Sequence, residues 1–129
     1  MTPETKVNGI NLDQLFSTID LLKQKPELAK FQFRVTNKWL GGTHSRATVS
    51  GFYGPGQEDT SRAPVSYDLD EPEVLLGTNQ GTNPVEYLLV ALSGCITTTI
   101  VAYASAKKIL LRGVESRFEG DIDLRGFLN

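Results

Sequence analysis

The sequence predicts an α+β domain in which a mainly antiparallel sheet packs on one long, buried central helix. Two observations carry this prediction. Several segments alternate apolar and polar residues with a period of two, as half-buried strands do. Residues 87–106 contain no charged side chain, which is typical of a helix that is apolar all round and lies in the centre of a domain.

The composition limits the class of protein. The chain of 129 residues suits one domain with its own core, and its 40% hydrophobic and 22% charged residues are typical of soluble globular proteins. A net charge of -2 gives no reason to expect a nucleic acid or an anionic membrane as a partner. The single cysteine excludes an intrachain disulfide, and residues 1–25 show no signal peptide. We therefore expect a cytoplasmic protein.

Residues 1–30 are expected to form a helical extension ahead of the main domain, which covers residues 31–129. Asn11 or Asp13 can cap a short helix. Apolar residues then recur at helical spacing, namely Leu12, Leu15, Phe16, Ile19 and Leu22. Pro26 is expected to end this helix or to begin a short second turn.

The predicted strands are separated by turn-rich segments. They cover residues 31–39, 44–53, 65–69 and 114–125. Gly41-Gly42 is a tight-turn pair and predicts a hairpin between the first two strands. Residues 54–64 form a polar loop without periodicity, and residues 70–82 are acidic and rich in turn residues.

The central helix has a strong predicted start. Asn83 is the expected N-cap, Pro84 takes the first helical position, and Glu86 falls where its carboxylate can reach back to the cap amide. The uncharged stretch is about as long as a membrane span. Serine, threonine and glycine residues dilute it, however, so we expect a buried helix of a soluble domain.

Several motifs of this chain resemble the OsmC/Ohr family. The helix motif NPVEYLLVALSGCITTT begins at Asn83, with GTNQGTNP before it and SRFEGDIDLRGF after it. The stretch GGTHSRATVSGFYGPGQEDTSR, which begins at Gly41, is similar to the amino-terminal hairpin and loop of an OsmC-like branch. The resemblance covers roughly residues 31–129.

The resemblance implies an α+β fold built as an intertwined homodimer, with its sites at the subunit interface. It also implies a thiol peroxidase that reduces organic hydroperoxides, in which Cys95 matches the peroxidatic cysteine. The family's resolving cysteine has no counterpart here. Either the carboxy-terminal part of the domain is missing from this chain, or the chain represents a branch with one cysteine. In both cases an external thiol must regenerate Cys95.

Two further positions depart from the family pattern. Val85 stands where the family places its glutamate, and Glu86 follows one step later. Thr43 and His44 stand where the family has its arginine, and Arg46 is the nearest arginine. Arg46 is expected either to pair with the thiolate or to be a solvated strand residue. Glu86 is expected either to hold this arginine or to cap the helix.

Cys95 also has two interpretations. It is a nucleophile if a cation or a helix start stabilises its thiolate, and otherwise it is a small buried hydrophobic residue. A helix break at Ser93-Gly94 would place Cys95 at the start of a second helical segment. The sequence predicts no cofactor and no metal site, because one cysteine and one distant histidine do not make a zinc site.

The sequence thus favours reduction of organic hydroperoxides by Cys95, with Arg46 and Glu86 as further candidate catalytic residues. The expected partners are a second copy of the chain, a small organic hydroperoxide and a thiol reductant. An apolar pocket around Leu88, Leu92 and the aromatic residues would favour organic hydroperoxides over hydrogen peroxide. The alternative is a non-catalytic dimeric member of the same fold, with a small-molecule-binding or structural role.

Overall fold

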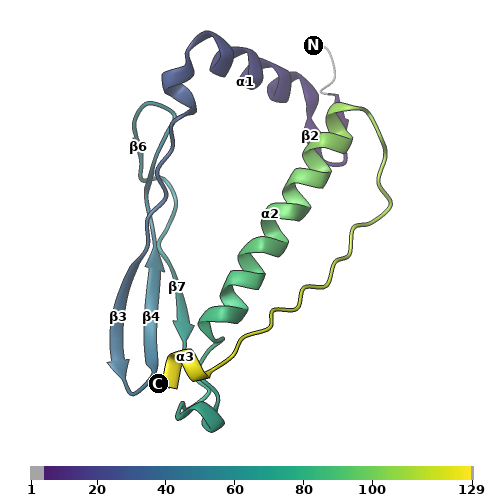
Figure 1. The fold of residues 1–129 in the computed structure, drawn as a ribbon. Coiled ribbons are helices and arrows are strands. Elements are labelled where there is room, and N and C mark those ends of the chain that lie inside the picture. Colours follow the sequence, from purple (N-terminus) through teal and green to yellow (C-terminus); the bar gives the residue numbers. More distant parts are fainter. Residues whose placement is uncertain (1–4, 129) are drawn as a thin grey trace.

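The computed structural model describes residues 5–128 (Figure 1). A sheet and a long helix stand opposite each other, and a shorter helix crosses one end of both. The helices are α1 (Leu12–Gln24), α2 (Pro84–Ala106) and α3 (Arg125–Leu128). The strands are β1 (Lys6–Val7), β2 (Ile10–Asn11), β3 (Thr36–Gly41), β4 (His44–Val49), β5 (Phe52–Tyr53), β6 (Glu58–Asp59) and β7 (Val65–Leu69). Antiparallel sheets with one long helix confirm the predicted fold class.

The main sheet has the order β3-β4-β7, with antiparallel pairing throughout. In its register Asn37 lies opposite Ala47, which lies opposite Tyr67. One position along, Lys38 lies opposite Arg46, which lies opposite Asp68. Because side chains alternate between the two faces of a strand, these two rows lie on opposite faces of the sheet. The first row faces α2, since its members line the cavity described below.

The predicted strands agree with the structure where a neighbouring strand is present. The strand predicted at 65–69 is confirmed, as is the hairpin turn at Gly41-Gly42. The strand predicted at 31–39 begins only at Thr36, and the preceding segment contributes a single bridge between Gln32 and Tyr53. The strand predicted at 44–53 is divided into β4 and β5, which belong to different sheets.

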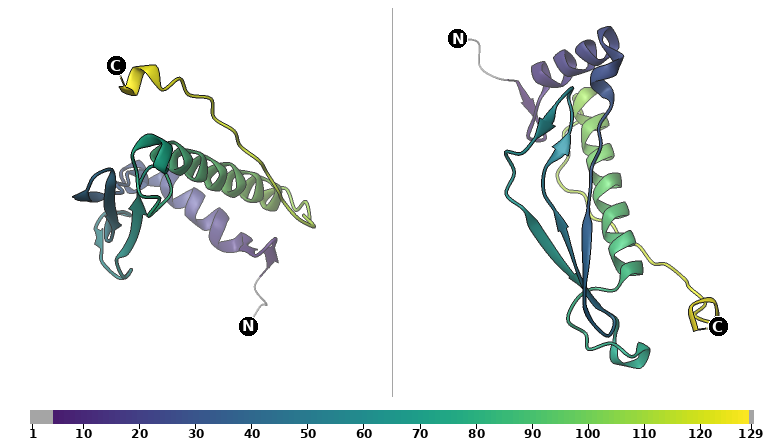
Figure 2. Two further views of the ribbon diagram at one scale, coloured as in Figure 1. Left: turned by 90° about the horizontal axis from the view of Figure 1, so that it is seen from below. Right: turned by 90° about the vertical axis from the view of Figure 1, so that its left-hand side faces the viewer.

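The strand predicted at 114–125 is wrong for the single chain. This segment is extended but pairs with no strand among the described residues, and its last residue begins α3. It runs along α2 on the side away from the sheet (Figures 1 and 2). This segment therefore alternates apolar and polar residues as a strand does, but no strand of the same chain lies close enough to pair with it.

The amino-terminal extension is tied to the far end of α2. Asn11 caps α1, because its side chain accepts a hydrogen bond of 3.0 Å from the Gln14 amide. The β1–β2 turn holds Asn8 in a left-handed conformation with a φ of 52°. Its side-chain amide donates to the Ile109 carbonyl at 2.8 Å, and its oxygen accepts from the Leu111 amide at 2.9 Å. This turn thus fixes the point where the chain leaves α2.

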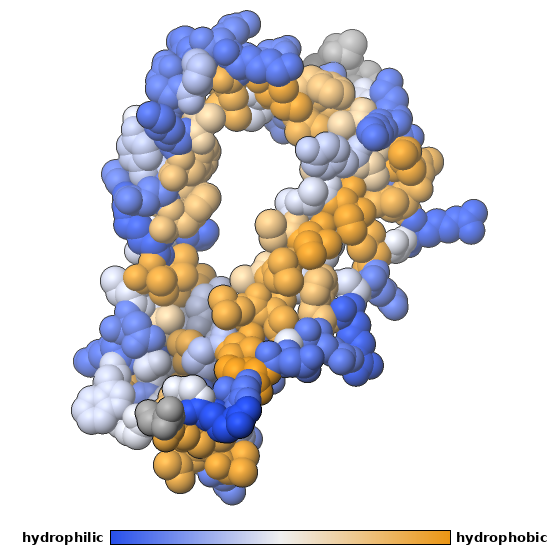
Figure 3. Space-filling model, in the orientation of Figure 1, coloured by the Kyte–Doolittle hydropathy of each residue, from blue (hydrophilic) through white to orange (hydrophobic). Residues whose placement is uncertain are grey.

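The prediction that the central helix is buried is wrong for the single chain. Within α2 only Ser105 is buried, and the buried hydrophobic residues of the described chain are Val7 and Leu12. The helix is long and apolar enough to cross a membrane, and 11% of its most apolar window is buried. Figure 3 shows apolar side chains lining an open hollow between the sheet and the helices. One chain therefore supplies too few neighbours to cover its own apolar surface.

Candidate functional site

Cys95 lies in the middle of α2 and is exposed. It follows Ala91 by four residues, which places it on the same side of the helix and about 6 Å further along the axis. Ala91 itself lines an apolar cavity between α2 and the sheet. The thiol therefore lies next to this cavity, one helical turn beyond its wall.

The proposed break in the helix at Ser93-Gly94 is wrong, because α2 is unbroken from Pro84 to Ala106. Ser93 does not cap a second segment, since its hydroxyl donates to the Val90 carbonyl at 2.7 Å. Thr97 and Thr99 bind back to the preceding turn in the same way, at 2.8 and 2.9 Å. Cys95 consequently has no helix start beside it, and this part of the helix offers no positive dipole end to the sulfur.

The cavity has a volume of about 580 Å³ and an almost wholly apolar lining. It is lined by Val35, Asn37, Ala47, Tyr67, Leu69, Tyr87, Val90 and Ala91. Its two tyrosine rings meet edge to face, with 6.3 Å between their centroids. The prediction of an apolar pocket with aromatic residues agrees with this cavity, but the two predicted leucines are wrong, because Leu88 is 71% exposed and neither Leu88 nor Leu92 lines the cavity.

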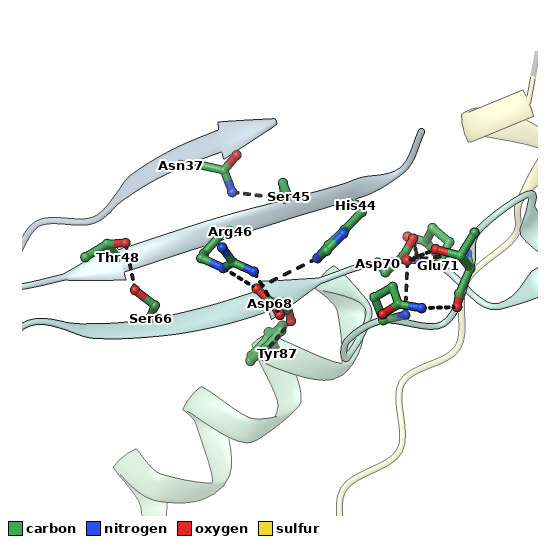
Figure 4. A network of polar contacts seen from close by, with 12 residues as sticks. Asn37, His44, Ser45, Arg46, Thr48, Ser66, Asp68, Asp70, Glu71 and Tyr87 are labelled. Carbon is green, nitrogen blue, oxygen red and sulfur yellow. Dashed lines mark hydrogen bonds and ion pairs between the residues drawn. The ribbon is translucent and has the colours of Figure 1, made fainter. Parts of the chain in front are cut away.

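Arg46 lies on the sheet face that points away from α2, in register with Lys38 and Asp68. Its Nε donates to the Asp68 carboxylate at 2.6 Å, and His44 Nε2 lies 3.8 Å from the same carboxylate (Figure 4). The hydrogen bond from Arg46 holds the pKa of Asp68 below its usual range. The structure therefore brings Arg46 to Asp68 and does not bring it to Cys95 of the same chain.

Glu86 occupies the capping position that the sequence predicts as one of its two roles. The Asn83 side chain accepts from the Glu86 amide at 2.8 Å, and the Glu86 carboxylate accepts from the Asn83 amide at 3.1 Å. It precedes Cys95 by nine residues, which on an unbroken helix separates the two by about 13 Å along the axis. Glu86 and Cys95 therefore do not meet within one chain.

This geometry predicts that Glu86→Gln retains the peroxide turnover of the wild type within about twofold. Glutamine can accept the same hydrogen bond at this position of a capping box, so stability should change by less than about 0.5 kcal/mol. Glu86→Ala is the matched variant and should lower stability by about 1 kcal/mol. A large loss of turnover in the glutamine variant, with unchanged melting, would assign a catalytic role to the carboxylate.

Asp70 is a buried carboxylate that sequence reasoning did not single out. It is 1% exposed and accepts five hydrogen bonds. The donors are the Thr43 hydroxyl at 2.5 Å, the Glu71 amide at 2.7 Å, the Thr78 amide and hydroxyl at 3.3 and 2.8 Å, and the Gln80 amide at 3.1 Å. The Thr43 hydroxyl makes the largest contribution to holding the pKa of Asp70 far below its usual range. Asp70 thus joins the β3–β4 turn to the loop that leads into α2.

The comparisons with known proteins concern this same part of the chain. Residues 77–128 match the family model described as OsmC-like protein. This match confirms the family resemblance over these residues alone, which run from Gly77 to α3 and make up less than half of the chain. It points to a redox function related to peroxides. No curated protein matches the chain.

Steric contacts explain why glycine occupies positions 77 and 81 in the OsmC-like segment. A Cβ atom on Gly77 would clash with the backbone of Glu71, and one on Gly81 would clash with the Asp68 carbonyl. The motif GTNQGTNP therefore has three roles. Its two glycines allow close backbone contacts, and Thr78 and Gln80 donate hydrogen bonds to Asp70. Asn83 caps α2. The sequence shows the spacing of this motif, but it does not show that the motif donates hydrogen bonds to Asp70.

No group of three or more His, Cys, Asp or Glu side chains within residues 5–128 is placed to hold a metal ion. The described residues do place one exposed thiol beside an apolar cavity.

Proposed function

We propose that the protein reduces organic hydroperoxides with Cys95 as its nucleophile. The observation that carries this proposal is the position of the only thiol, which lies exposed on α2 one turn beyond the wall of an apolar cavity. A substrate with an apolar tail can occupy this cavity while its peroxide group reaches the sulfur. The OsmC-like match over residues 77–128 supports a redox role for this segment.

The proposed reaction has an oxidative and a reductive half. The Cys95 thiolate attacks the terminal oxygen of the hydroperoxide, and an S–O bond forms as the O–O bond breaks. The sulfur is oxidised to sulfenic acid, and the leaving alkoxide takes a proton to become an alcohol. One external thiol then displaces water and forms a mixed disulfide with Cys95. A second thiol releases the reduced enzyme as it forms the disulfide of the reductant.

The composition of the cavity supports organic substrates over hydrogen peroxide. Its polar side chains are largely engaged: Tyr87 donates to the Asp68 carbonyl at 2.8 Å, and Asn37 donates to Ser45 at 3.1 Å. Burial of an apolar tail in this cavity therefore gives a favourable binding free energy, whereas hydrogen peroxide has no apolar group to bury. The expected result is a kcat/KM that rises with the size of the alkyl group.

We further propose that the protein acts as a homodimer. The accessible surface of the chain is 10301 Å², whereas a folded monomer of 14.2 kDa exposes roughly 6,800 Å². Covering the difference in two copies would bury roughly 7,000 Å² in total, as large obligate interfaces do. The same association would cover the exposed apolar side of α2 without a lipid bilayer.

The test is peroxide turnover with a dithiol reductant in Cys95→Ser. We expect turnover of an alkyl hydroperoxide to fall at least about a thousandfold, because serine cannot form the sulfenic acid. Ser93→Ala is the matched control on the same helix and should retain turnover. Full activity in Cys95→Ser would end the proposal, and so would a wild-type protein without activity toward any alkyl hydroperoxide.

One observation favours the second candidate function, a non-catalytic dimeric member that binds a small apolar molecule. Arg46 is the arginine nearest to the position where the family has its arginine. It pairs with Asp68 on the face of the sheet that points away from α2, so its positive charge does not lie beside Cys95 of the same chain. Alkylation with iodoacetamide at pH 7 separates the two functions. A rate well above that of free cysteine supports the peroxidase, and a rate equal to it or below supports the binding protein.

A further inference from the structure

We propose that Gly94 determines which hydroperoxides reach Cys95, because it leaves open the space between the apolar cavity and the sulfur. The inference rests on the peroxidase function proposed above and names a residue that sets its substrate range. Gly94 lies in the middle of α2, directly before Cys95. It acts through the volume that it leaves free and takes no part in the chemistry.

The fold of the chain does not require glycine at position 94. Gly94 has no positive φ, and α2 runs through it without a break. A Cβ atom on Gly94 would meet no atom of residues 5–128 within 4 Å, whereas those on Gly77 and Gly81 would clash with backbone. Glycine inside a helix is less favourable than alanine, because it loses more backbone entropy on folding. Free space beside the helix is thus what glycine provides here.

This free space lies on the side of α2 that lines the cavity. Successive residues of a helix are turned by about 100°, and Tyr87, Val90 and Ala91 line the cavity. Gly94 points within roughly 15° of the mean direction of these three residues, whereas Cys95 points roughly 90° away from it. Gly94 therefore lies at the centre of the cavity-facing side of the helix, and Cys95 lies at its border.

The tilt of helical side chains brings the same space next to the sulfur. Each Cα–Cβ bond of a helix leans toward the N-terminus, so the Cys95 side chain leans over Ala91. A side chain at position 94 would lean the same way, between the sulfur and the end of the cavity. Because Ala91 carries only a methyl group and Gly94 carries no side chain, a substrate in the cavity can reach the sulfur past both.

A larger side chain at position 94 should exclude substrates by their size. In a tertiary hydroperoxide, the carbon that bears the peroxide group carries three further substituents, and these lie beside Gly94 when the O–O bond reaches the sulfur. Hydrogen peroxide has no such carbon and needs far less space. The ratio of kcat/KM for the two substrates therefore reports access to Cys95 separately from the reactivity of its thiolate.

Gly94→Leu tests this role, with Ser93→Leu as the matched control. Position 93 points roughly 110° away from the cavity direction, so a leucine there leaves the free space open. We expect kcat/KM for cumene hydroperoxide to fall at least about thirtyfold in Gly94→Leu, and kcat/KM for hydrogen peroxide to change less than about threefold. Equal losses for both peroxides in Gly94→Leu would overturn the inference, and so would the same discrimination in Ser93→Leu.

Alkylation of the thiol gives a readout that does not depend on peroxide turnover. N-phenylmaleimide is a bulky apolar reagent, iodoacetamide is a small polar one, and both react with the Cys95 thiolate. In Gly94→Leu we expect N-phenylmaleimide to react at least about tenfold more slowly and iodoacetamide to react at the wild-type rate. An unchanged ratio of the two rates would overturn the inference. A wild type without peroxide turnover would instead end the proposed function, and the alkylation ratio would still decide whether Gly94 controls access.

Gly94→Ala separates a substrate from a second copy of the chain as the occupant of this space. Alanine is the better helix former and its Cβ atom has room, so the melting temperature should rise by about 4 °C with unchanged sedimentation. A shift toward monomer in sedimentation would show that a second copy packs closely against Gly94. That result would overturn the inference, because the space would then not be open to a substrate.

Discussion

Asp70→Asn is expected to lower the melting temperature of the protein by roughly 10 °C. The carboxylate has two oxygens that accept five hydrogen bonds, and Asn replaces one of them by a donor. In either amide orientation, an NH₂ group then faces N–H or O–H donors such as Thr43 or Gln80. Because Asp70 is 1% exposed, water cannot take over these bonds.

The effect of Asp70→Asn should depend on pH in a defined direction. The pKa of Asp70 is depressed in the folded state, so its contribution to stability is fully present above its unfolded pKa of about 3.9. That contribution is lost progressively as the pH falls further toward the folded pKa. The melting temperatures of the wild type and the variant should therefore differ most near pH 7 and converge below about pH 4.

Thermal unfolding monitored by circular dichroism at pH 7 and at pH 3 measures both effects. Asp20→Asn is a suitable control, because Asp20 is exposed on α1 and the substitution should leave the melting temperature nearly unchanged. An Asp70→Asn protein that melts with the wild type at pH 7 would show that the loop from 71 to 82 does not depend on this carboxylate.

Gly81→Ala is expected to destabilise the fold by about 3 kcal/mol. A Cβ atom at this position would overlap the Asp68 carbonyl, and a backbone atom cannot turn away as a flexible side chain can. The same carbonyl accepts the hydrogen bond from the Tyr87 hydroxyl. Relief of the overlap would therefore separate β7 from the first turn of α2.

Urea unfolding of Gly81→Ala measures this loss. Gly126→Ala is the matched control, because a Cβ atom there meets nothing within 4 Å, and we expect a change within about 0.5 kcal/mol. Equal stability of the two variants would mean that the loop shifts to admit a methyl group. The close approach of Gly81 to β7 would then be no reason for glycine at this position.

Local sequence patterns determined the elements whose interactions lie within a few residues. The capping box of Asn83 and Glu86, the Asn11 cap of α1 and the Gly41-Gly42 hairpin all form as predicted. Each depends on hydrogen bonds or turn geometry among residues a few positions apart, so the local sequence is sufficient to predict it. The helix motif and the glycine-rich loop before it were also sufficient to indicate the OsmC-like family.

Only the tertiary structure decided what depends on distant neighbours. Residues 114–124 alternate apolar and polar side chains like a strand, yet they are unpaired because α2 lies between them and the sheet. From the sequence, Arg46 is a candidate partner of Cys95. The sheet register instead places it opposite Asp68, on the face of the sheet that points away from α2. Asp70 was one carboxylate in an acidic stretch until folding gathered five donors around it. Strand pairing, burial and the surroundings of a charge arise from long-range contacts, which local alternation and spacing do not specify.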